Sequence, residues 1–291
     1  MHAVVFAYHD VGVNCLKALL AAGIQVDLVV THQDDPNENV WFGSVAKLCQ
    51  EKNIKYITPN ASQLIELIPK LQALAPDYIF SFYYRHMIPA KILATAKIAA
   101  LNMHGSLLPK YRGRAPVNWA ILHGESETGA TLHVMEAKPD AGDIVGQASV
   151  VIGPDETATE IFGKVSQAAV KVINQALSDL ITGKVTRRPN ELQKGSYFGG
   201  RKPSDGQIHW NQTALQVHNL VRAVAPPYPG AFTDHQDKTM IVGKTSLKGP
   251  FPANLDLGLT GIQVVDNRVF GICGDRQVVE ILEWFPAATK K

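Results

Sequence analysis

Residues 4–30, with the sequence VVFAYHDVGVNCLKALLAAGIQVDLVV, contain two short apolar runs on either side of a helical one. Residues 4–8 and 26–30 are rich in β-branched and aromatic side chains, which is typical of buried strands. Residues 14–22 are typical of a helix, and Gly23 can end it. A strand, a helix and a second strand in this order predict a βαβ unit with parallel strands.

The same alternation continues along the chain. Further strands are predicted at residues 56–57, 78–82, 99–103, 131–135 and 144–151, and helices at residues 43–52, 61–74, 117–123 and 157–181. Thr157 and Glu160 have the spacing of a capping box for the last of these helices, and Gly183 can end it. The expected fold is therefore α/β with a mostly parallel sheet.

The composition of the segments changes after residue 184. Pro, Gly and short β-branched runs replace the long helices, with one helical exception near residues 214–223. We therefore predict an α/β domain at residues 1–200 and a smaller, β-rich domain at residues 201–291, whose size lies within the usual domain range.

Composition and charge argue against several classes of protein. Of the 291 residues, 46% are hydrophobic and 19% are charged, which is ordinary globular composition. The formal net charge is only +2, so no nucleic-acid partner is expected. The cysteines form no CxxC pair, so we predict neither a metal site nor a disulfide framework. No apolar run approaches the roughly 20 residues of a membrane helix, and the start of the chain has no secretory leader. We expect a cytoplasmic protein without a membrane span.

The end of the first predicted strand, Tyr8-His9-Asp10-Val11-Gly12, is a place where an open α/β sheet can bind a ligand. A dinucleotide-binding fold would have GxGxxG here, and its absence disfavours a nicotinamide or flavin enzyme. Tyr8 and His9 could contact a small ligand, but a polar loop between strand and helix explains them equally well.

The segment NMHGSLLP, residues 102–109, carries the strongest chemical signal. Asn102 and His104 alternate along a predicted strand, so their side chains should point the same way from its end. A carboxamide can donate hydrogen bonds to a developing oxyanion, and an imidazole can move protons near neutral pH. The pair suits attack on a carbonyl, although a single histidine at a strand end is more often structural.

The segment KPDAGD, residues 138–143, can complete such a site. Asp140 could orient and charge-stabilise His104, or relay its proton. Asp143 is equally acidic and close by, and spacing alone does not choose between the two carboxylates.

Three cationic residues lie in the five positions that follow residues 102–109. They are Lys110, Arg112 and Arg114. A flexible basic loop beside a strand end suits a phosphate or diphosphate, because guanidinium groups bind phosphate oxygens bidentately. A solvated surface loop is the alternative.

These motifs resemble the signature of formyltransferases that use 10-formyltetrahydrofolate. The resemblance lies in Asn102-x-His104-x-Ser106-Leu107-Leu108-Pro109 followed by Asp140-x-Gly142. The family includes enzymes that act on methionyl-tRNA, on glycinamide ribonucleotide and on amino sugars. Within the family, the chain is most similar to the formyltransferase domains of ArnA proteins, through the segments at residues 4–10, 79–88, 102–119, 124–129 and 222–232.

The resemblance implies a fold and an activity. A Rossmann-like catalytic domain would be followed by an OB-like, β-rich domain. The formyl group of 10-formyltetrahydrofolate would pass to the 4-amine of UDP-4-amino-4-deoxy-L-arabinose, in the lipid A modification that gives polymyxin resistance. ArnA proteins commonly continue into a dehydrogenase, for which these 291 residues leave no room. A stand-alone enzyme and an excised domain both remain open.

The resemblance also implies roles for individual residues. Asn102 would stabilise the oxyanion, His104 would assist proton transfer, and Asp140 would hold the imidazole or accept the proton. The folate would lie against the backbone around Asp140 and against Tyr84, Arg85, His86, Met87 and Ile88. The nucleotide-linked sugar would be bound by Tyr8, His9, Ser106, Lys110, Arg112 and Arg114.

Other functions remain open at this point. The modest charge and the residues Arg114, Asn118 and Trp119 favour a sugar over methionyl-tRNA as the acceptor. A dTDP-linked amino sugar differs from its UDP counterpart by one methyl group on the base, which is worth only about 1–3 kcal/mol in a pocket. A non-catalytic nucleotide or folate sensor, and a hydrolase that releases formate from the folate, are the remaining alternatives.

Overall fold

The computed structural model describes residues 1–36 and 38–287, and its contacts divide the chain into two compact units. Unit 1 consists of Met1–Gly113, Thr128–Val150 and Gly163–Phe198. Unit 2 consists of Arg114–Glu127, Val151–Phe162 and Gly199–Lys291. Two segments from earlier in the chain, Arg114–Glu127 and Val151–Phe162, therefore join the C-terminal residues in unit 2.

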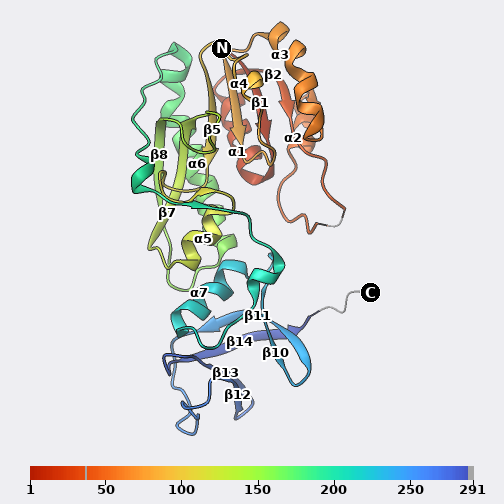
Figure 1. The fold of residues 1–291 in the computed structure, drawn as a ribbon. Helices are drawn as coiled ribbons and strands as arrows, with labels where there is room; N and C mark the ends of the chain where they lie inside the picture. The colour runs from red at the N-terminus through yellow and green to blue at the C-terminus, as the bar shows by residue number, and fades with distance from the viewer. Residues whose placement is uncertain (37, 288–291) are drawn as a thin grey trace. The chain divides into compact units, whose positions relative to one another are not determined.

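Unit 1 is built on a seven-stranded sheet in the order β3-β2-β1-β4-β5-β7-β8 (Figure 1). Its strands are β1 His2–Ala7, β2 Gln25–Val30, β3 Tyr56–Ile57, β4 Tyr78–Phe82, β5 Ala99–His104, β7 Glu127–Val134 and β8 Ile144–Val151. The first five of these strands pair in parallel, and β7 runs antiparallel to β5. The predicted α/β fold with a mostly parallel sheet is confirmed.

Helices cover both faces of this sheet, which keeps a parallel sheet out of water. They are α1 His9–Ala21, α2 Val45–Glu51, η1 Ser62–Leu67, α3 Ile68–Leu74, α4 Ala90–Leu93, α6 Ala158–Thr182 and the short turn η2 Leu192–Lys194. Side chains of η1, α3 and α4 join those of β1, β2 and β4 in one apolar cluster. On β4, the hydroxyl of Tyr78 donates to the carbonyl of Leu180 in α6 at 3.0 Å.

Two helices differ from the sequence prediction. Helix α1 begins at His9 rather than at residue 14, and the N–H of Gly12 already donates to the carbonyl of Tyr8 at 3.1 Å. The helix predicted at residues 61–74 is divided into the 3-10 turn η1 and the helix α3. Pro69 lies at the start of α3. Proline has no N–H and its ring clashes with the carbonyl four residues earlier, so an α-helix can start there but not run through.

The capping box predicted at the start of α6 is confirmed. The carboxylate of Glu160 accepts from the N–H of Thr157 at 2.7 Å, and the N–H of Glu160 donates to the hydroxyl of Thr157 at 3.4 Å. Gly183 follows the helix with a φ of 71°, a conformation that glycine adopts without steric cost.

Unit 2 contains a five-stranded sheet in the order β10-β11-β14-β13-β12, in which every pair is antiparallel. Its elements are α5 Pro116–Leu122, η3 Pro203–Gly206, α7 Ala214–Val224, β10 Ala231–His235, β11 Lys238–Ser246, β12 Gly261–Val265, β13 Arg268–Ile272 and β14 Val278–Pro286. The carboxamide of Asn118 in α5 donates to the carbonyl of Ala223 in α7 at 2.6 Å. The expected β-rich second part is confirmed.

Over the part of the chain described, no helix is both long and apolar enough to cross a membrane.

Candidate active site

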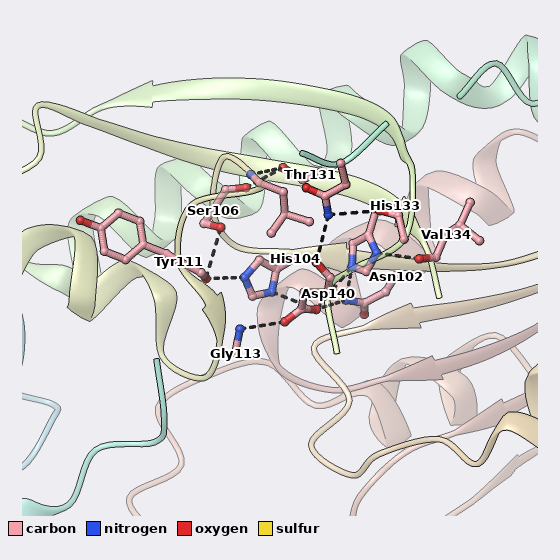
Figure 2. Close-up of polar contacts among 12 residues, drawn as sticks. Asn102, His104, Ser106, Tyr111, Gly113, Thr131, His133, Val134 and Asp140 are labelled. Atoms are coloured by element: carbon pink, nitrogen blue, oxygen red, sulfur yellow. Dashed lines mark hydrogen bonds and ion pairs between the residues drawn. The ribbon is translucent and has the colours of Figure 1, made fainter. Parts of the chain in front are cut away.

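Asn102, His104 and Asp140 form a cluster at one end of β5 in unit 1 (Figure 2). Asn102 Nδ2 lies 3.4 Å from Asp140 Oδ1, and His104 Nδ1 lies 3.6 Å from the same oxygen. The side chains of His104 and Asp140 are only 8% and 12% exposed. Asp143, which spacing could not distinguish from Asp140, is exposed. The structure thus brings together the three residues that the family resemblance singles out.

The loop around Asp140 explains why the motif contains a glycine two residues later. Asp140 has a φ of 49°, a left-handed conformation that costs a non-glycine residue roughly 1–2 kcal/mol. Hydrogen bonds hold it there: Asn190 Nδ2 donates to the Asp140 carbonyl at 3.0 Å, and the N–H of Gly113 donates to its carboxylate at 2.8 Å. At Gly142, a Cβ would collide with the carbonyl oxygen of Val134, so only glycine fits.

The environment of Asp140 keeps its carboxyl group ionised. Burial by itself raises the pKa of Asp140. The interactions with His104 and His133 and the N–H of Gly113 act in the opposite direction and outweigh burial, so the pKa lies well below its usual range. Asp140 is therefore a carboxylate at neutral pH, suited to orienting an imidazole and stabilising its protonated form.

The tautomer of His104 is set by the backbone of the following turn. His104 Nε2 lies 2.8 Å from the carbonyl oxygen of Tyr111, which can only accept a hydrogen bond, so Nε2 carries the hydrogen. Nδ1, which faces Asp140, then holds the lone pair when the ring is neutral. Ser106 is fully buried and its hydroxyl donates to the carbonyl of Lys110 at 2.6 Å, which shapes the same turn. Direct contact between Ser106 and a substrate stays a prediction.

His133 is a further member of the cluster that the sequence did not indicate. It lies opposite Asn102 in the antiparallel pair of β5 and β7. His133 Nδ1 lies 2.8 Å from the carbonyl oxygen of Val134 and so carries the hydrogen. His133 Nε2 can then accept from Asn102 Nδ2, 3.0 Å away. His133 therefore helps to fix the orientation of the Asn102 carboxamide, and its Nε2 also lies 3.4 Å from Asp140 Oδ1. Only the register of β5 and β7 reveals this contact.

We expect His133→Leu to lower kcat by about tenfold, because it removes one hydrogen bond that orients the Asn102 carboxamide. His133→Gln retains an acceptor oxygen and should recover part of the loss. Steady-state kinetics with circular dichroism as a folding control measure both effects, with the change expected in kcat more than in KM. A His133→Leu enzyme with wild-type kcat would contradict this positioning role.

The three cationic residues that follow residues 102–109 differ in burial. Arg112 begins the short strand β6 Arg112–Gly113, which pairs in parallel with β9 Tyr197–Phe198. The side chain of Arg112 is buried, and its Nε and Nη1 atoms have no hydrogen-bond partner among the described residues. The solvated loop considered from sequence is therefore wrong for Arg112, whereas Lys110 and Arg114 are exposed. Phosphate binding by these three residues stays a prediction.

Tyr8 and His9 lie where β1 leads into α1 and pack against the segment that follows β2. The hydroxyl of Tyr8 donates to Asp34 at 2.7 Å, and the ring of His9 stacks on Phe42 at 3.9 Å between centroids. Both side chains are thus held by the loop after β2. Their contact with a substrate stays a prediction.

The residues after β4, expected to bind folate, divide into packed and exposed side chains. The rings of Tyr84 and His86 contact the ring of His32 at 4.2 and 4.7 Å. Ile88 belongs to the apolar core, whereas Met87 is 63% exposed. The hydroxyl of Tyr84 is buried with no hydrogen-bond partner among the described residues, and burial raises its pKa to about 12.

A bidentate ion pair ties this segment to the loop after β2. Both terminal nitrogens of Arg85 bind the carboxylate of Glu38 at 2.6 Å. The N–H of Arg85 also donates to His32 Nε2 at 3.0 Å, and its guanidinium lies 4.7 Å from the centre of the Tyr8 ring. The loop after β2 and the residues that follow β4 therefore pack against each other.

Acidification should weaken this packing. Burial lowers the pKa of His9 and of His32 to about 4, below the value of about 6.5 expected in an unfolded chain. Between these values the unfolded state binds more protons, so the free energy of unfolding should fall as the pH drops from about 6.5 to 4. We expect about 1 kcal/mol from each histidine, less than the full shift because both rings are partly solvated. Urea unfolding at a series of pH values, with a smaller slope in His32→Phe, would measure this; an unchanged slope would contradict it.

Comparison with solved structures shows the same fold in sugar formyltransferases. WlaRD, a sugar 3N-formyl transferase determined with dTDP and 5-N-formyl-THF, is 20% identical, with a TM-score of 0.72 over 96% of this chain and 96% of that one. An N-formyltransferase from Helicobacter canadensis, in complex with folinic acid and dTDP-3-aminofucose, is also 20% identical, with a TM-score of 0.72 over 96% of this chain and 98% of that one. HypX from Aquifex aeolicus, with tetrahydrofolic acid, is 18% identical, with a TM-score of 0.66 over 98% of this chain and 44% of that one.

Family models match the sequence itself over most of its length. Residues 2–177 match the formyl transferase model, and residues 201–291 match the model of the formyl transferase C-terminal domain. The first match contains β5 with Asn102 and His104 as well as the loop with Asp140. The chain therefore belongs to the formyl transferase family.

Proposed function

We propose that the protein transfers the formyl group of 10-formyltetrahydrofolate to the amine of a nucleotide-linked amino sugar. The observation that carries this proposal is the buried cluster of Asn102, His104 and Asp140, in which a hydrogen-bond donor, a proton carrier and an ionised carboxylate meet. The folates and dTDP bound by the solved sugar formyltransferases of this fold support it.

Asn102 is the residue that would stabilise negative charge on the formyl oxygen. Its two N–H groups reach His133 at 3.0 Å and Asp140 at 3.4 Å. The hydrogen bond to Asp140 is long and weak. This N–H group can therefore donate instead to the formyl oxygen as negative charge develops on it. The bond to His133 keeps the carboxamide in place meanwhile.

His104 would receive the proton that the attacking amine loses. Its Nε2 hydrogen is committed to Tyr111, so the proton would arrive at Nδ1, 3.6 Å from the Asp140 carboxylate. The imidazolium that results would be stabilised by that negative charge. Because the pKa of Asp140 is held so low, the imidazole and not the carboxylate would keep the proton.

The residues after β4 would hold the folate, which supplies the activated formyl carbon. The exposed side chain of Met87 would offer an apolar surface to a bound pterin, with Tyr84 as a further member of the site. Arg85, His86, Ile88 and the backbone around Asp140 would complete this binding site.

For the acceptor we propose UDP-4-amino-4-deoxy-L-arabinose, with the protein acting in lipid A modification and polymyxin resistance. The resemblance of the segments at residues 79–88, 102–119 and 222–232 to ArnA proteins supports this choice. Sugar and nucleotide contacts would come from residues that adjoin the cluster in sequence or end a neighbouring strand. These are Tyr8, His9, Ser106, Lys110, Arg112 and Arg114.

A formyl-transfer assay over a panel of acceptors tests the proposal. The panel contains UDP-4-amino-4-deoxy-L-arabinose, dTDP-linked 3-amino and 4-amino sugars, and initiator methionyl-tRNA, each with 10-formyltetrahydrofolate. We expect the UDP-linked sugar to have the highest kcat/KM. A dTDP-linked sugar in first place would overturn the choice of nucleotide. Formylation of the tRNA alone, with salt-sensitive binding, would overturn the choice of a sugar.

A further inference from the structure

One short stretch of backbone, residues 111–113, contacts both His104 and Asp140 (Figure 2). The carbonyl oxygen of Tyr111 lies 2.8 Å from His104 Nε2. Two residues later, the N–H of Gly113 donates to the carboxylate of Asp140 at 2.8 Å. The path of this backbone therefore decides which nitrogen of His104 carries the hydrogen and how the Asp140 carboxylate is held beside it.

Tyr111 has a backbone conformation that needs support. Its φ of 57° lies in the left-handed region, which is unfavourable for a residue with a Cβ. The support comes from Ser196, 85 residues later in the chain, whose hydroxyl accepts from the N–H of Tyr111 at 2.9 Å. The N–H of Ser196 donates to the carbonyl of Pro109 at 3.3 Å, and its carbonyl accepts from the N–H of Arg112 at 3.0 Å. One serine thus makes three hydrogen bonds to residues 109–112.

These hydrogen bonds determine where the Tyr111 carbonyl points. A peptide group is planar, so an N–H that is held in place also fixes the carbonyl of the same group. The Tyr111 carbonyl shares its peptide group with the N–H of Arg112, which Ser196 binds through its own carbonyl. The preceding peptide group contains the N–H of Tyr111, which Ser196 binds through its hydroxyl. Ser196 therefore holds both peptide groups that flank the α-carbon of Tyr111.

The neighbours of Ser196 fit closely against the same turn. A Cβ on Gly195 would collide with the carbonyl oxygen of Pro109, so the chain can approach this closely only with glycine. The ring of Phe198 stacks on the ring of Tyr111, with 5.4 Å between centroids. Both segments belong to unit 1, as do His104 and Asp140. The serine and the turn are therefore held against one another within a single compact unit.

We propose that Ser196 is a positioning residue for formyl transfer, which keeps the Tyr111 carbonyl in place to accept from His104 Nε2; the proposal rests on the function proposed above. The imidazole lies between the Tyr111 carbonyl at Nε2 and the Asp140 carboxylate, 3.6 Å from Nδ1. A carboxylate is the stronger acceptor. The neutral ring therefore keeps its hydrogen on Nε2 only while the carbonyl stays close. With the hydrogen on Nδ1, that nitrogen could not take the proton of the attacking amine.

Removal of the Ser196 hydroxyl tests this role in kinetics. We expect Ser196→Ala to lower kcat by about five- to tenfold, because the buried N–H of Tyr111 loses its acceptor. KM for the folate and for the sugar should be nearly unchanged, since the hydroxyl does not contact either. Ser196→Thr keeps the hydroxyl and should keep the wild-type kcat. Ser178→Ala, which removes an exposed hydroxyl on α6, is the matched control, and circular dichroism checks folding.

The ring nitrogens of His104 provide a readout that a merely structural role would not change. NMR correlation of ¹⁵N and ¹H in protein labelled with ¹⁵N-histidine, at mildly alkaline pH, shows which ring nitrogen carries the hydrogen. The signals of His104 are identified by their absence from His104→Ala. We expect the hydrogen on Nε2 in the wild type and in Ser196→Thr, and a measurable share of it on Nδ1 in Ser196→Ala.

The outcomes separate the role of Ser196 from the function. A folded Ser196→Ala enzyme with the wild-type kcat, or with the wild-type tautomer of His104, would overturn the positioning role and leave the proposed function standing. A Ser196→Thr enzyme as slow as Ser196→Ala would overturn that role as well. A wild-type protein that formylates none of the acceptors would overturn the proposed function, and the NMR measurement would still decide whether Ser196 sets the tautomer.

Discussion

Replacing His104 by alanine is expected to lower kcat of formyl transfer by about 10²–10⁴-fold, the usual contribution of a general acid–base group. The imidazole carries its hydrogen on Nε2, which is bound to the Tyr111 carbonyl, and leaves Nδ1 to take a proton beside an ionised carboxylate. Without it, the proton of the attacking amine loses its acceptor, and Asp140 is a poor substitute because its pKa is low. Steady-state kinetics on the proposed substrates would measure the loss.

A matched variant makes this result specific. His209→Ala removes an exposed histidine elsewhere in the chain and should leave the rate unchanged. A folded His104→Ala enzyme with near-wild-type kcat would show that the proton takes another route.

Replacing Asn102 by aspartate should be nearly as damaging, with kcat reduced by about 10²–10³-fold or more, the cost of one oxyanion donor. The substitution keeps the size of the side chain but removes the N–H groups. It also adds a carboxyl group next to Asp140, which is already ionised. A carboxylate there would repel the negative charge that develops on the formyl oxygen.

Comparison of two variants separates the lost donor from the added charge. Asn102→Ala removes the donor alone and should lose activity by about 10²-fold, whereas Asn102→Asp should lose at least as much. Binding of 5-formyltetrahydrofolate should change little in Asn102→Ala, because the carboxamide acts on the reacting oxygen. An Asn102→Asp enzyme that is more active than Asn102→Ala would contradict the oxyanion role.

Much of the fold could be predicted because its signals are local. Residues 78–82 and 144–151 form strands with the predicted bounds. Each is a short apolar run, and the residues on either side of it end the strand. The start of α6 follows from Thr157 and Glu160, which satisfy one another across a single turn. The sequence pattern places the start of α1 too late, because the residues Tyr8 to Asp10 resemble a loop when their packing partners are unknown.

The candidate site could be predicted only where its geometry is local. Asn102 and His104 point the same way because they alternate along one strand. The position of His133 depends on the register between β5 and β7, and the preference for Asp140 over Asp143 depends on contacts with Gly113 and Asn190. Such contacts join residues far apart in the chain, and no periodic pattern encodes them.

The measurement that tests the account most directly follows the formyl group itself. The protein is incubated with 10-formyltetrahydrofolate carrying ¹³C in its formyl group and with UDP-4-amino-4-deoxy-L-arabinose, and the label is followed by NMR. The account predicts that the label leaves the folate and appears as an amide carbon on the sugar, with Asn102→Ala and His104→Ala losing this signal. Label that appears as free formate, or that stays on the folate while both ligands bind, would contradict the account.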